Sequence, residues 1–236
     1  MSRGGNMDYT RNEIIGKCNE AMSNVSTFYN QKFVNYRGRT TDTNEYYTEV
    51  IAEFVCDNIK EFEEIPTVTR QASYKTQGHG GDYSQQSNRL EEITAMQMFK
   101  QSQAGTAYDY IGKIIDYQVP LKNKKDDEVG KIDLLSVSYD TLYILELKKE
   151  DSTETMLRCI LEGYTYLKTV DSDKLVNDFG LMGIHKVCSC PFVFREKNQW
   201  KEMQENRPQL MKLMKLMDSK PYYIKKIKDK FIITED

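Results

Sequence analysis

The chain of 236 residues is 39% hydrophobic and 29% charged, with a formal net charge of −3 at pH 7, which suits one α/β domain with an additional subdomain. Residues 1–6 are polar and no apolar run approaches membrane-spanning length, so we expect neither a signal peptide nor a membrane segment, and a cytoplasmic protein. Five cysteines, an odd number in a chain of this length, predict free thiols and argue against a disulfide framework.

Residues 1–70 predict an N-terminal helical extension made of two helices. The first is expected over residues 10–32 and the second over residues 42–62. A capping box at residues 42–45 predicts the start of the second helix. Its apolar stripe follows helical spacing through Tyr46, Val50, Phe54 and Ile59. Residues 71–88 are polar and rich in Gly, Ser and Gln, which predicts a mobile loop and a candidate lid before the core.

Residues 89–194 predict the core of the protein, with six elements in the order α-β-β-β-α-β. These are a helix over 89–100, strands over 111–121, 131–137 and 142–148, a helix after a capping box at 151–154, and a strand over 184–194. The second helix carries an apolar stripe at Leu157, Leu161, Tyr164 and Leu167. We therefore expect an α/β fold with a mixed central sheet.

Residues 195–236 predict a basic C-terminal part that packs on the core. A helix is expected over 199–217, with a break at Pro208, followed by a hairpin over 222–234 that turns near Asp229. Residues 195–230 contain eleven Lys and Arg against five Asp and Glu. This excess of positive charge fits a surface that contacts phosphates, and it fits an ordinary solvated face equally well.

Two carboxylates face each other across the predicted core hairpin. The two strands are joined by a four-residue turn, so Val137 is expected opposite Leu142. That register places Asp133 opposite Glu146, and Lys148 lies on the same face because side chains alternate along a strand. Opposed carboxylates repel at the roughly 4.5–5.5 Å between paired Cβ atoms unless a cation lies between them. The hairpin therefore predicts a divalent cation site beside an amine.

The same residues resemble the signature of the PD-(D/E)XK nuclease superfamily, in which an acidic residue on one strand is followed by (D/E)-x-K on the next. Here Asp133 is followed, after twelve residues, by Glu146-Leu147-Lys148, and Ile132 stands where the signature has proline. The predicted α-β-β-β-α-β order is also the core order of that superfamily. The resemblance covers residues 89–194 and implies a restriction-endonuclease-like core that hydrolyses phosphodiester bonds.

The resemblance also implies how the site works. Mg²⁺, for which Mn²⁺ can substitute, would be held by Asp133, Glu146 and the backbone carbonyl of Leu147. Lys148 would orient the attacking water, help it lose a proton and stabilise the charged transition state. A glutamate on the first core helix would complete the catalytic and metal-binding set.

Two glutamates compete for that last position. Glu92 is preferred because it lies at helical spacing with Met96 and Phe99, which we expect to face the sheet, and Glu91 is the alternative. The second core helix lacks the usual glutamine-to-tyrosine pattern of the superfamily. It still offers three candidate auxiliary residues, Glu162, Tyr164 and Tyr166.

We therefore expect a metal-dependent nuclease that acts on DNA. Two alternatives stay open: a catalytically inactive relative that uses the fold for nucleic-acid binding or assembly, and an RNA-directed nuclease. The sequence shows no zinc finger or clear helix-turn-helix, so sequence specificity and strand preference are not predicted, and a homodimer is left open. Cys188 and Cys190 are expected to pack as small hydrophobes in an apolar strand, and the group that they form with His185 is not expected to bind zinc.

Overall fold

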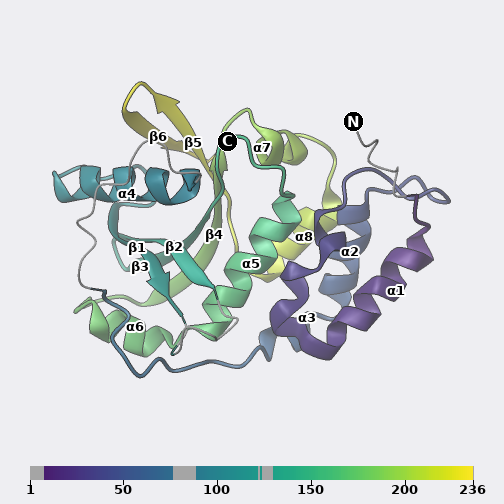
Figure 1. Cartoon of the computed structure of the whole chain (residues 1–236), viewed down its shortest axis with the longest axis horizontal. Helices are drawn as coiled ribbons and strands as arrows, with labels where there is room; N and C mark the ends of the chain where they lie inside the picture. The colour runs from purple at the N-terminus through teal and green to yellow at the C-terminus, as the bar shows by residue number, and fades with distance from the viewer. Residues whose placement is uncertain (1–7, 77–88, 122, 124–129, 236) are drawn as a thin grey trace.

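The computed structural model describes residues 8–76, 89–121, 123 and 130–235. At the centre of this described part lies one sheet whose six strands neighbour each other in chain order (Figure 1). The strands are β1 (Lys113–Pro120), β2 (Lys131–Ser138), β3 (Thr141–Leu147), β4 (Lys186–Phe194), β5 (Tyr222–Ile227) and β6 (Lys230–Thr234). β3, β4 and β5 are parallel, and the other neighbouring pairs are antiparallel. The predicted α/β class with a mixed sheet is confirmed.

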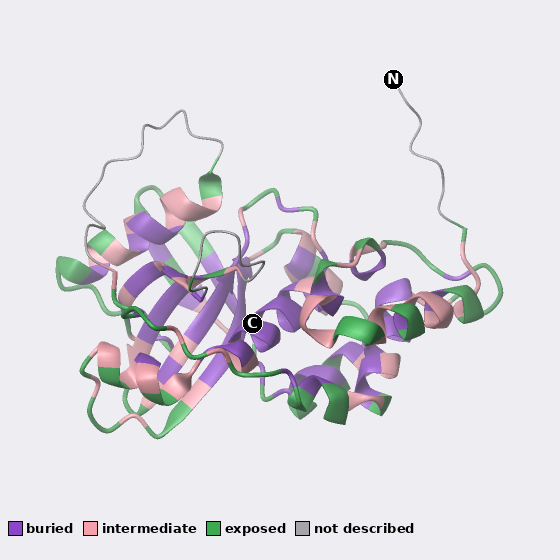
Figure 2. Cartoon of the chain, turned by 60° about the horizontal axis from the view of Figure 1, so that its bottom comes forward, coloured by how far each residue is buried: buried purple, intermediate pink, exposed green. Residues whose placement is uncertain are grey.

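Two helices cover opposite faces of the sheet, α4 (Leu90–Gln103) on one and α5 (Met156–Thr169) on the other. Because side chains alternate along a strand, consecutive strand residues are sorted into two buried clusters. The cluster that includes α4 contains Leu134, Leu145 and Phe192, and the cluster that includes α5 contains Leu135, Ile144 and Val193. Figure 2 shows buried residues along the strands and the inner sides of the helices.

The predicted order α-β-β-β-α-β is present, with one helix that the sequence reading did not include. This helix, α6 (Ser172–Asp178), lies between α5 and β4 and is capped by the Asp171 side chain, which accepts from Lys174 N. The predicted hairpin register is confirmed from Val137, which pairs with Leu142, to Leu134, which pairs with Leu145. The paired residues end there, before Asp133 and Glu146. The strands that carry the candidate site residues therefore run as expected.

The N-terminal extension is helical, but its boundaries differ from the prediction. α1 (Arg11–Ala21) has a capping box between Thr10 and Glu13, and the chain then continues as 3₁₀ segments over Met22–Asn30 and Lys32–Asn35. Residues 23–27, Ser-Asn-Val-Ser-Thr, are weak helix formers, which explains why the α-helix stops early.

The second predicted helix begins later than expected and is divided into α2 (Tyr47–Asp57) and α3 (Ile59–Glu63). The predicted capping box at residues 42–45 is wrong, because Asp42 instead accepts a hydrogen bond of 2.9 Å from the Arg11 backbone N–H. The Asp42 side chain, which the local pattern predicted as a helix cap, therefore forms a tertiary contact with α1 instead.

The start of α5 is also corrected. The expected capping box at residues 151–154 is not its cap, since Thr155 is the N-cap and its side chain accepts from Arg158 N. Glu154 is consequently free to point toward the sheet. Its backbone N–H bonds to Ser152 Oγ at 3.3 Å.

The C-terminal part agrees with the sequence reading. α7 (Asn198–Met203) and α8 (Pro208–Leu216) are separated before Pro208, which occupies the start of α8, and β5 and β6 form the expected hairpin. The apolar side of α8 is buried, with Leu210, Leu213 and Met214 in the core. α8 packs on α2, and Glu49 of α2 accepts from the Gln209 and Leu210 backbone N–H groups.

The predicted loop and lid over residues 71–88 lies mostly outside the described residues, which stop at residue 76 and resume at 89. Its described beginning is anchored, because Tyr74 is fully buried and its backbone N–H donates to Asp178 Oδ2 at 2.8 Å. All five cysteines are free and buried. In the described part of the chain, no helix is long and apolar enough to cross a membrane.

Candidate functional site

The site residues predicted on the strands come together at the end of β3. Glu146 lies near that end, Lys148 follows it, and Asp133 lies on the adjacent β2. Asp133 Oδ2 accepts from Leu147 N at 3.0 Å, and its Oδ1 accepts from Gln118 Nε2 at 3.0 Å. Because Gln118 belongs to β1, the Asp133 carboxylate connects three strands at one point.

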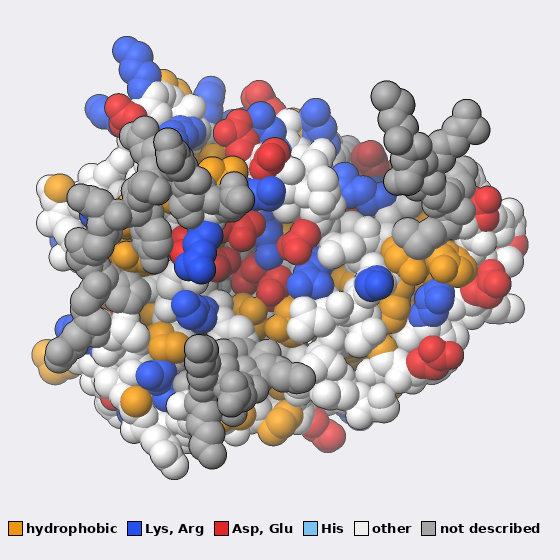
Figure 3. Space-filling view, viewed as in Figure 1, with side chains coloured by type: hydrophobic (Ala, Val, Ile, Leu, Met, Phe, Trp, Pro, Cys, Tyr) orange, Lys and Arg blue, Asp and Glu red, His pale blue; other side chains and the backbone are white. Residues whose placement is uncertain are grey.

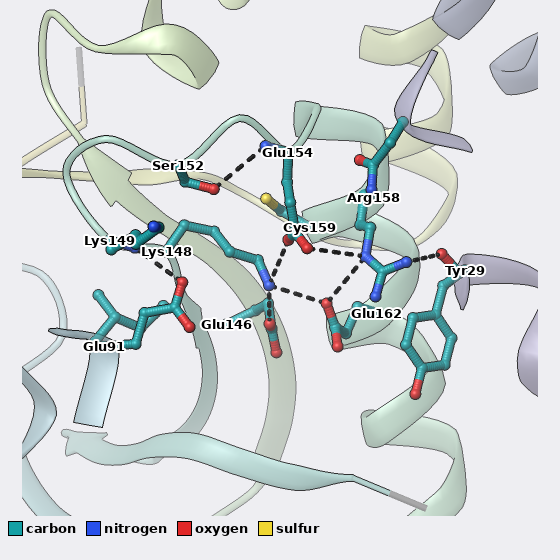
Figure 4. A network of polar contacts seen from close by, with 12 residues as sticks. Tyr29, Glu91, Glu146, Lys148, Lys149, Ser152, Glu154, Arg158, Cys159 and Glu162 are labelled. Carbon is teal, nitrogen blue, oxygen red and sulfur yellow. Dashed lines mark hydrogen bonds and ion pairs between the residues drawn. The ribbon is translucent and has the colours of Figure 1, made fainter. Parts of the chain in front are cut away.

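The Lys148 ammonium is surrounded by carboxylates (Figure 4). Its Nζ lies 2.6 Å from Glu146 Oε1, 2.8 Å from Glu154 Oε2 and 3.0 Å from Glu162 Oε2. The Lys148 ammonium donates hydrogen bonds to Glu146 and Glu162, and its contact with Glu154 is an ion pair without hydrogen-bond geometry. The side chain is only 7% exposed, so solvent screens these interactions weakly.

Arg158 of α5 closes the network from the other side. Its Nε lies 3.4 Å from Glu154 Oε1 and 3.7 Å from Glu162 Oε2, and its Nη1 donates to the Tyr29 carbonyl at 2.7 Å. Tyr166 lies one turn of α5 after Glu162, and its hydroxyl donates to Glu162 Oε1 at 3.0 Å. Glu162 is therefore held through both of its oxygens.

Negative charge exceeds positive charge in this network, and the excess falls on the two strand carboxylates. Burial raises the pKa of Asp133 to about 7, and Lys148 opposes this only in part. Burial and the neighbouring charge of Glu162 also raise the pKa of Glu146. For Glu162 the effect of burial is outweighed by Lys148 and Arg158, so its pKa is lowered. Asp133 and Glu146 are thus the groups whose ionised forms lack sufficient compensation.

The first turn of α4 brings Glu91 against the site. Glu91 Oε1 accepts from Lys149 N at 3.0 Å, as Figure 4 shows, and its charge adds to the raised pKa of Asp133 after the larger influences of burial and Lys148. Glu92 instead forms an ion pair with Arg89, at 3.2 Å. The sequence reading preferred Glu92, whereas the geometry favours Glu91.

The burial of α4 explains this difference. The buried residues of α4 are Ala95, Met96, Met98 and Ser102. Ala95, Met98 and Ser102 follow Glu91 by four, seven and eleven positions, which places Glu91 on their helical face. Of the expected stripe, Met96 is buried and Phe99 is only partly buried. The buried face therefore lies nearer to Glu91 than the predicted stripe placed it.

A cavity of about 540 Å³ opens beside the ion-pair network. Its lining comes from α4, β1, β2 and the loop after β3, and comprises Arg89, Leu90, Glu91, Glu92, Gln118, Asp133, Lys149, Ser152, Thr153 and Glu154. Figure 3 shows Asp and Glu side chains gathered near the centre of this face, with Lys and Arg beside them. The cavity gives an external molecule access to Asp133 while Lys148 stays buried behind it.

The loop that connects β3 to α5 is held in place by the N-terminal extension on one side and by α7 on the other. Arg37 of the N-terminal extension donates to the carbonyls of Thr153 and Glu154, at 3.1 and 2.9 Å. On α7, Gln199 donates to the Glu154 carbonyl at 2.7 Å, and Asn198 to that of Ser152 at 2.7 Å. The backbone of Glu154 is therefore fixed next to Lys148 by residues distant in sequence.

The donor chemistry of the site suits a hard divalent cation, although its present arrangement is not that of a metal site. Among the described residues, no three His, Cys, Asp or Glu side chains form a group that could hold a metal ion. Glu146 points to Lys148 and Asp133 to neighbouring N–H groups. Carboxylate oxygens are the preferred ligands of Mg²⁺, and a cation beside Asp133 and Glu146 would oppose the burial that raises the pKa of both. The residues fit a cation provided that Glu146 turns away from Lys148.

The auxiliary residues predicted on α5 divide into two kinds. Glu162 and Tyr166 join the network around Lys148, whereas Tyr164 is buried in the core and its ring lies 5.5 Å from Lys168 Nζ. Sequence reasoning missed Glu154 and Arg158. The i, i+4 spacing of Glu154, Arg158 and Glu162 was the available signal.

Gln118 was also missed, and only the structure reveals it. It has a φ of 51°, in the left-handed region, within β1 and next to Asp133. A non-glycine residue in that region is uncommon and often accompanies a functional site. The sequence around Gln118 contains no sign of this conformation.

No protein family, curated protein or solved structure matches this chain.

Proposed function

We propose that the protein is a metal-dependent nuclease that hydrolyses phosphodiester bonds of DNA, with a restriction-endonuclease-like core. The observation that carries this proposal is the convergence of Asp133, Glu146, Lys148 and Glu91 beside one cavity. These groups come from two adjacent strands and a helix far apart in sequence. A solvated polar strand face does not require a buried lysine among three carboxylates.

The topology supports the same proposal. α4, the β1-β2-β3 antiparallel unit, α5 and the parallel strand β4 follow the order of the superfamily that the sequence resembles, with α6 as an insertion. The acidic residue lies on the second of these strands and the Glu-x-Lys on the third. Fold and site are thus consistent with each other, although a fold alone does not define an activity.

The chemistry follows from the charges at the site. A bound Mg²⁺ would neutralise negative charge that develops on the phosphate and would favour ionisation of water at neutral pH. Asp133, Glu146, Glu91 and the Leu147 carbonyl are the groups we assign to hold it. Once Glu146 leaves Lys148, one ammonium hydrogen becomes available to orient water and to stabilise the phosphate.

Cleavage assays with the purified protein test this proposal. Duplex, single-stranded and branched DNA and RNA, each with Mg²⁺, Mn²⁺ or a chelator, are compared side by side. We expect metal-dependent cleavage of DNA that stops on chelation. Cleavage of RNA alone would establish the RNA-directed alternative. Binding without cleavage of any substrate in any metal would establish the inactive alternative, in which the fold serves binding or assembly.

The assignment of the helix glutamate gives a separate prediction. Glu91→Gln retains an acceptor for Lys149 N but removes a charge from the proposed cation-binding set. We expect turnover to fall by at least about tenfold, the lower end of the loss seen when a residue that only supports a metal ligand is changed. Glu92→Gln removes only an i, i+3 pair with an exposed arginine and is the matched control. Steady-state turnover of both variants decides the point. Equal losses, or a larger loss in Glu92→Gln, would contradict the assignment.

A further inference from the structure

The β5–β6 hairpin is a basic two-stranded ribbon that projects from the sheet (Figure 1). It carries one carboxylate, Asp229, and four exposed lysines, Lys225, Lys226, Lys228 and Lys230. In the described part of the chain, none of these lysines forms an ion pair with a carboxylate. Figure 3, in the same view, shows Lys and Arg side chains on this projecting part. The hairpin therefore offers uncompensated positive charge to a partner.

The strand register sorts the side chains of the ribbon into two faces. One face is turned to the core and contains the buried residues Phe231 and Ile233. The other face is formed by two cross-strand pairs that are exposed, Lys225 with Ile232 and Ile227 with Lys230. This outward face combines cations with aliphatic groups, and its aromatic neighbours, Tyr222, Tyr223 and Phe231, are buried.

The tip of the ribbon is connected to the candidate site through α4. Gln101, near the end of α4, donates from Nε2 to the Asp229 carbonyl at 2.6 Å. Glu91, in the first turn of the same helix, lies ten residues earlier, which corresponds to roughly 15 Å along the helix axis. The helix thus holds the ribbon at a set distance from the site.

We propose that the outward face of the β5–β6 hairpin binds the phosphate backbone of duplex DNA beside the candidate site. This inference rests on the proposed nuclease function and adds a substrate class to it. A two-stranded ribbon fits the major groove, whereas binders of single strands typically stack bases on exposed aromatic rings, which this face lacks. At about 3.4 Å per phosphate along one strand, the 15 Å separation spans roughly four phosphates.

The test uses the full-length protein and two triple variants. In one variant, Lys225 and Lys230 of the outward face and Lys228 of the turn between the two strands are replaced by Gln. In the matched control, three exposed lysines of the N-terminal extension and α8 are replaced by Gln, namely Lys32, Lys60 and Lys212. Binding to a duplex and to a single strand of equal length is measured by fluorescence anisotropy with Ca²⁺ at several salt concentrations. Cleavage is measured with Mg²⁺.

We expect the hairpin variant to bind duplex DNA at least about tenfold more weakly at low salt. The slope of log K against log salt should fall in magnitude by about two to three, because up to three phosphate contacts are lost. Turnover at saturating DNA should stay within about twofold, and the control variant should resemble the parent. An unchanged slope and affinity in the hairpin variant, or an equal loss in the control, would overturn the inference.

The two proposals fail in different ways. A parent protein that cleaves DNA with no dependence on the hairpin lysines overturns the duplex-binding surface alone. A parent that binds duplex DNA through these lysines and cleaves nothing supports the surface and overturns the nuclease proposal. A parent that binds only single strands overturns the surface, and one that binds no nucleic acid overturns both.

Discussion

Replacement of Lys148 by methionine is expected to destabilise the metal-free protein by about 3–5 kcal/mol, because it leaves buried carboxylates without their shared cation. Methionine has a similar volume, so the change is one of charge and not of packing. Glu146, Glu154 and Glu162 each lie within 3.0 Å of the ammonium that is removed. If Lys148 also acts on the phosphate, turnover should fall by about 10²–10⁴-fold. Urea denaturation with chelator and single-turnover cleavage measure the two effects.

The neighbouring lysine provides the control for this prediction. The Lys149 side chain is 43% exposed and its Nζ lies 3.5 Å from Asp151 Oδ1, so Lys149→Met should change stability by less than about 1 kcal/mol. Adding Glu162→Gln to Lys148→Met should recover part of the lost stability, because one uncompensated charge disappears. Mn²⁺ should also bind Lys148→Met more tightly than the parent, since the ammonium no longer competes for Glu146. Stability and metal affinity that do not change in Lys148→Met would contradict the role of this lysine as counter-ion.

Asp133→Asn is expected to melt no lower than the parent without metal and to lose most of the stabilisation that Mn²⁺ gives the parent. An asparagine oxygen can still accept from Leu147 N, and Gln118 can turn its amide to match the new N–H group. A cation that binds only the folded parent at 100 times its Kd adds about 2.7 kcal/mol. Thermal melts with chelator measure the stability without metal, and melts with Mn²⁺ measure the stabilisation that the cation adds. Cleavage should be lost together with the response to Mn²⁺.

The raised pKa of Asp133 makes this prediction dependent on pH. The folded carboxyl has a pKa of about 7, well above the value near 3.9 of an unfolded chain, so between these values the folded state binds the extra proton. The stability that this proton adds to the folded state is fully present below the pKa of the unfolded chain and is lost as the pH rises through about 7. The metal-free parent should therefore gain stability from Asp133 on acidification from pH 7 toward pH 4, and Asp133→Asn should lack that gain.

Asp151→Asn is the control for Asp133→Asn, because its side chain is 73% exposed and lies on the loop after β3. It should keep the metal response, the cleavage activity and the pH profile of the parent. A full Mn²⁺ response in Asp133→Asn would place the metal elsewhere and remove the basis of the proposed site.

The strands and the site residues on them could be predicted because their information is local. Runs of branched and aromatic apolar residues indicate β2 and β3, and the four-residue turn sets the register that the pairs from Ser138–Thr141 to Leu134–Leu145 follow. The same reasoning recovers the break before Pro208, since proline has no N–H for an interior turn of helix.

The parts that could not be predicted depend on contacts between distant segments. The Asp42 side chain accepts from the Arg11 backbone N–H and does not cap α2. The loop that carries Glu154 is held by hydrogen bonds from Arg37 and Gln199. The choice between Glu91 and Glu92 depended on which side of α4 faces the sheet, and apolar spacing with Met96, which is itself buried, did not resolve it. The network around Lys148 was likewise hidden, because a pattern of charges does not show which of them are buried together.

The most direct test of the central claim is the position of Mn²⁺ in crystals of the purified protein, located by its anomalous scattering. We expect one ion bound by Asp133 and Glu146, with Glu146 turned away from the Lys148 ammonium that it contacts at 2.6 Å without metal. An ion bound elsewhere would contradict the account. So would a Glu146 that remains on Lys148 at Mn²⁺ concentrations that saturate the protein.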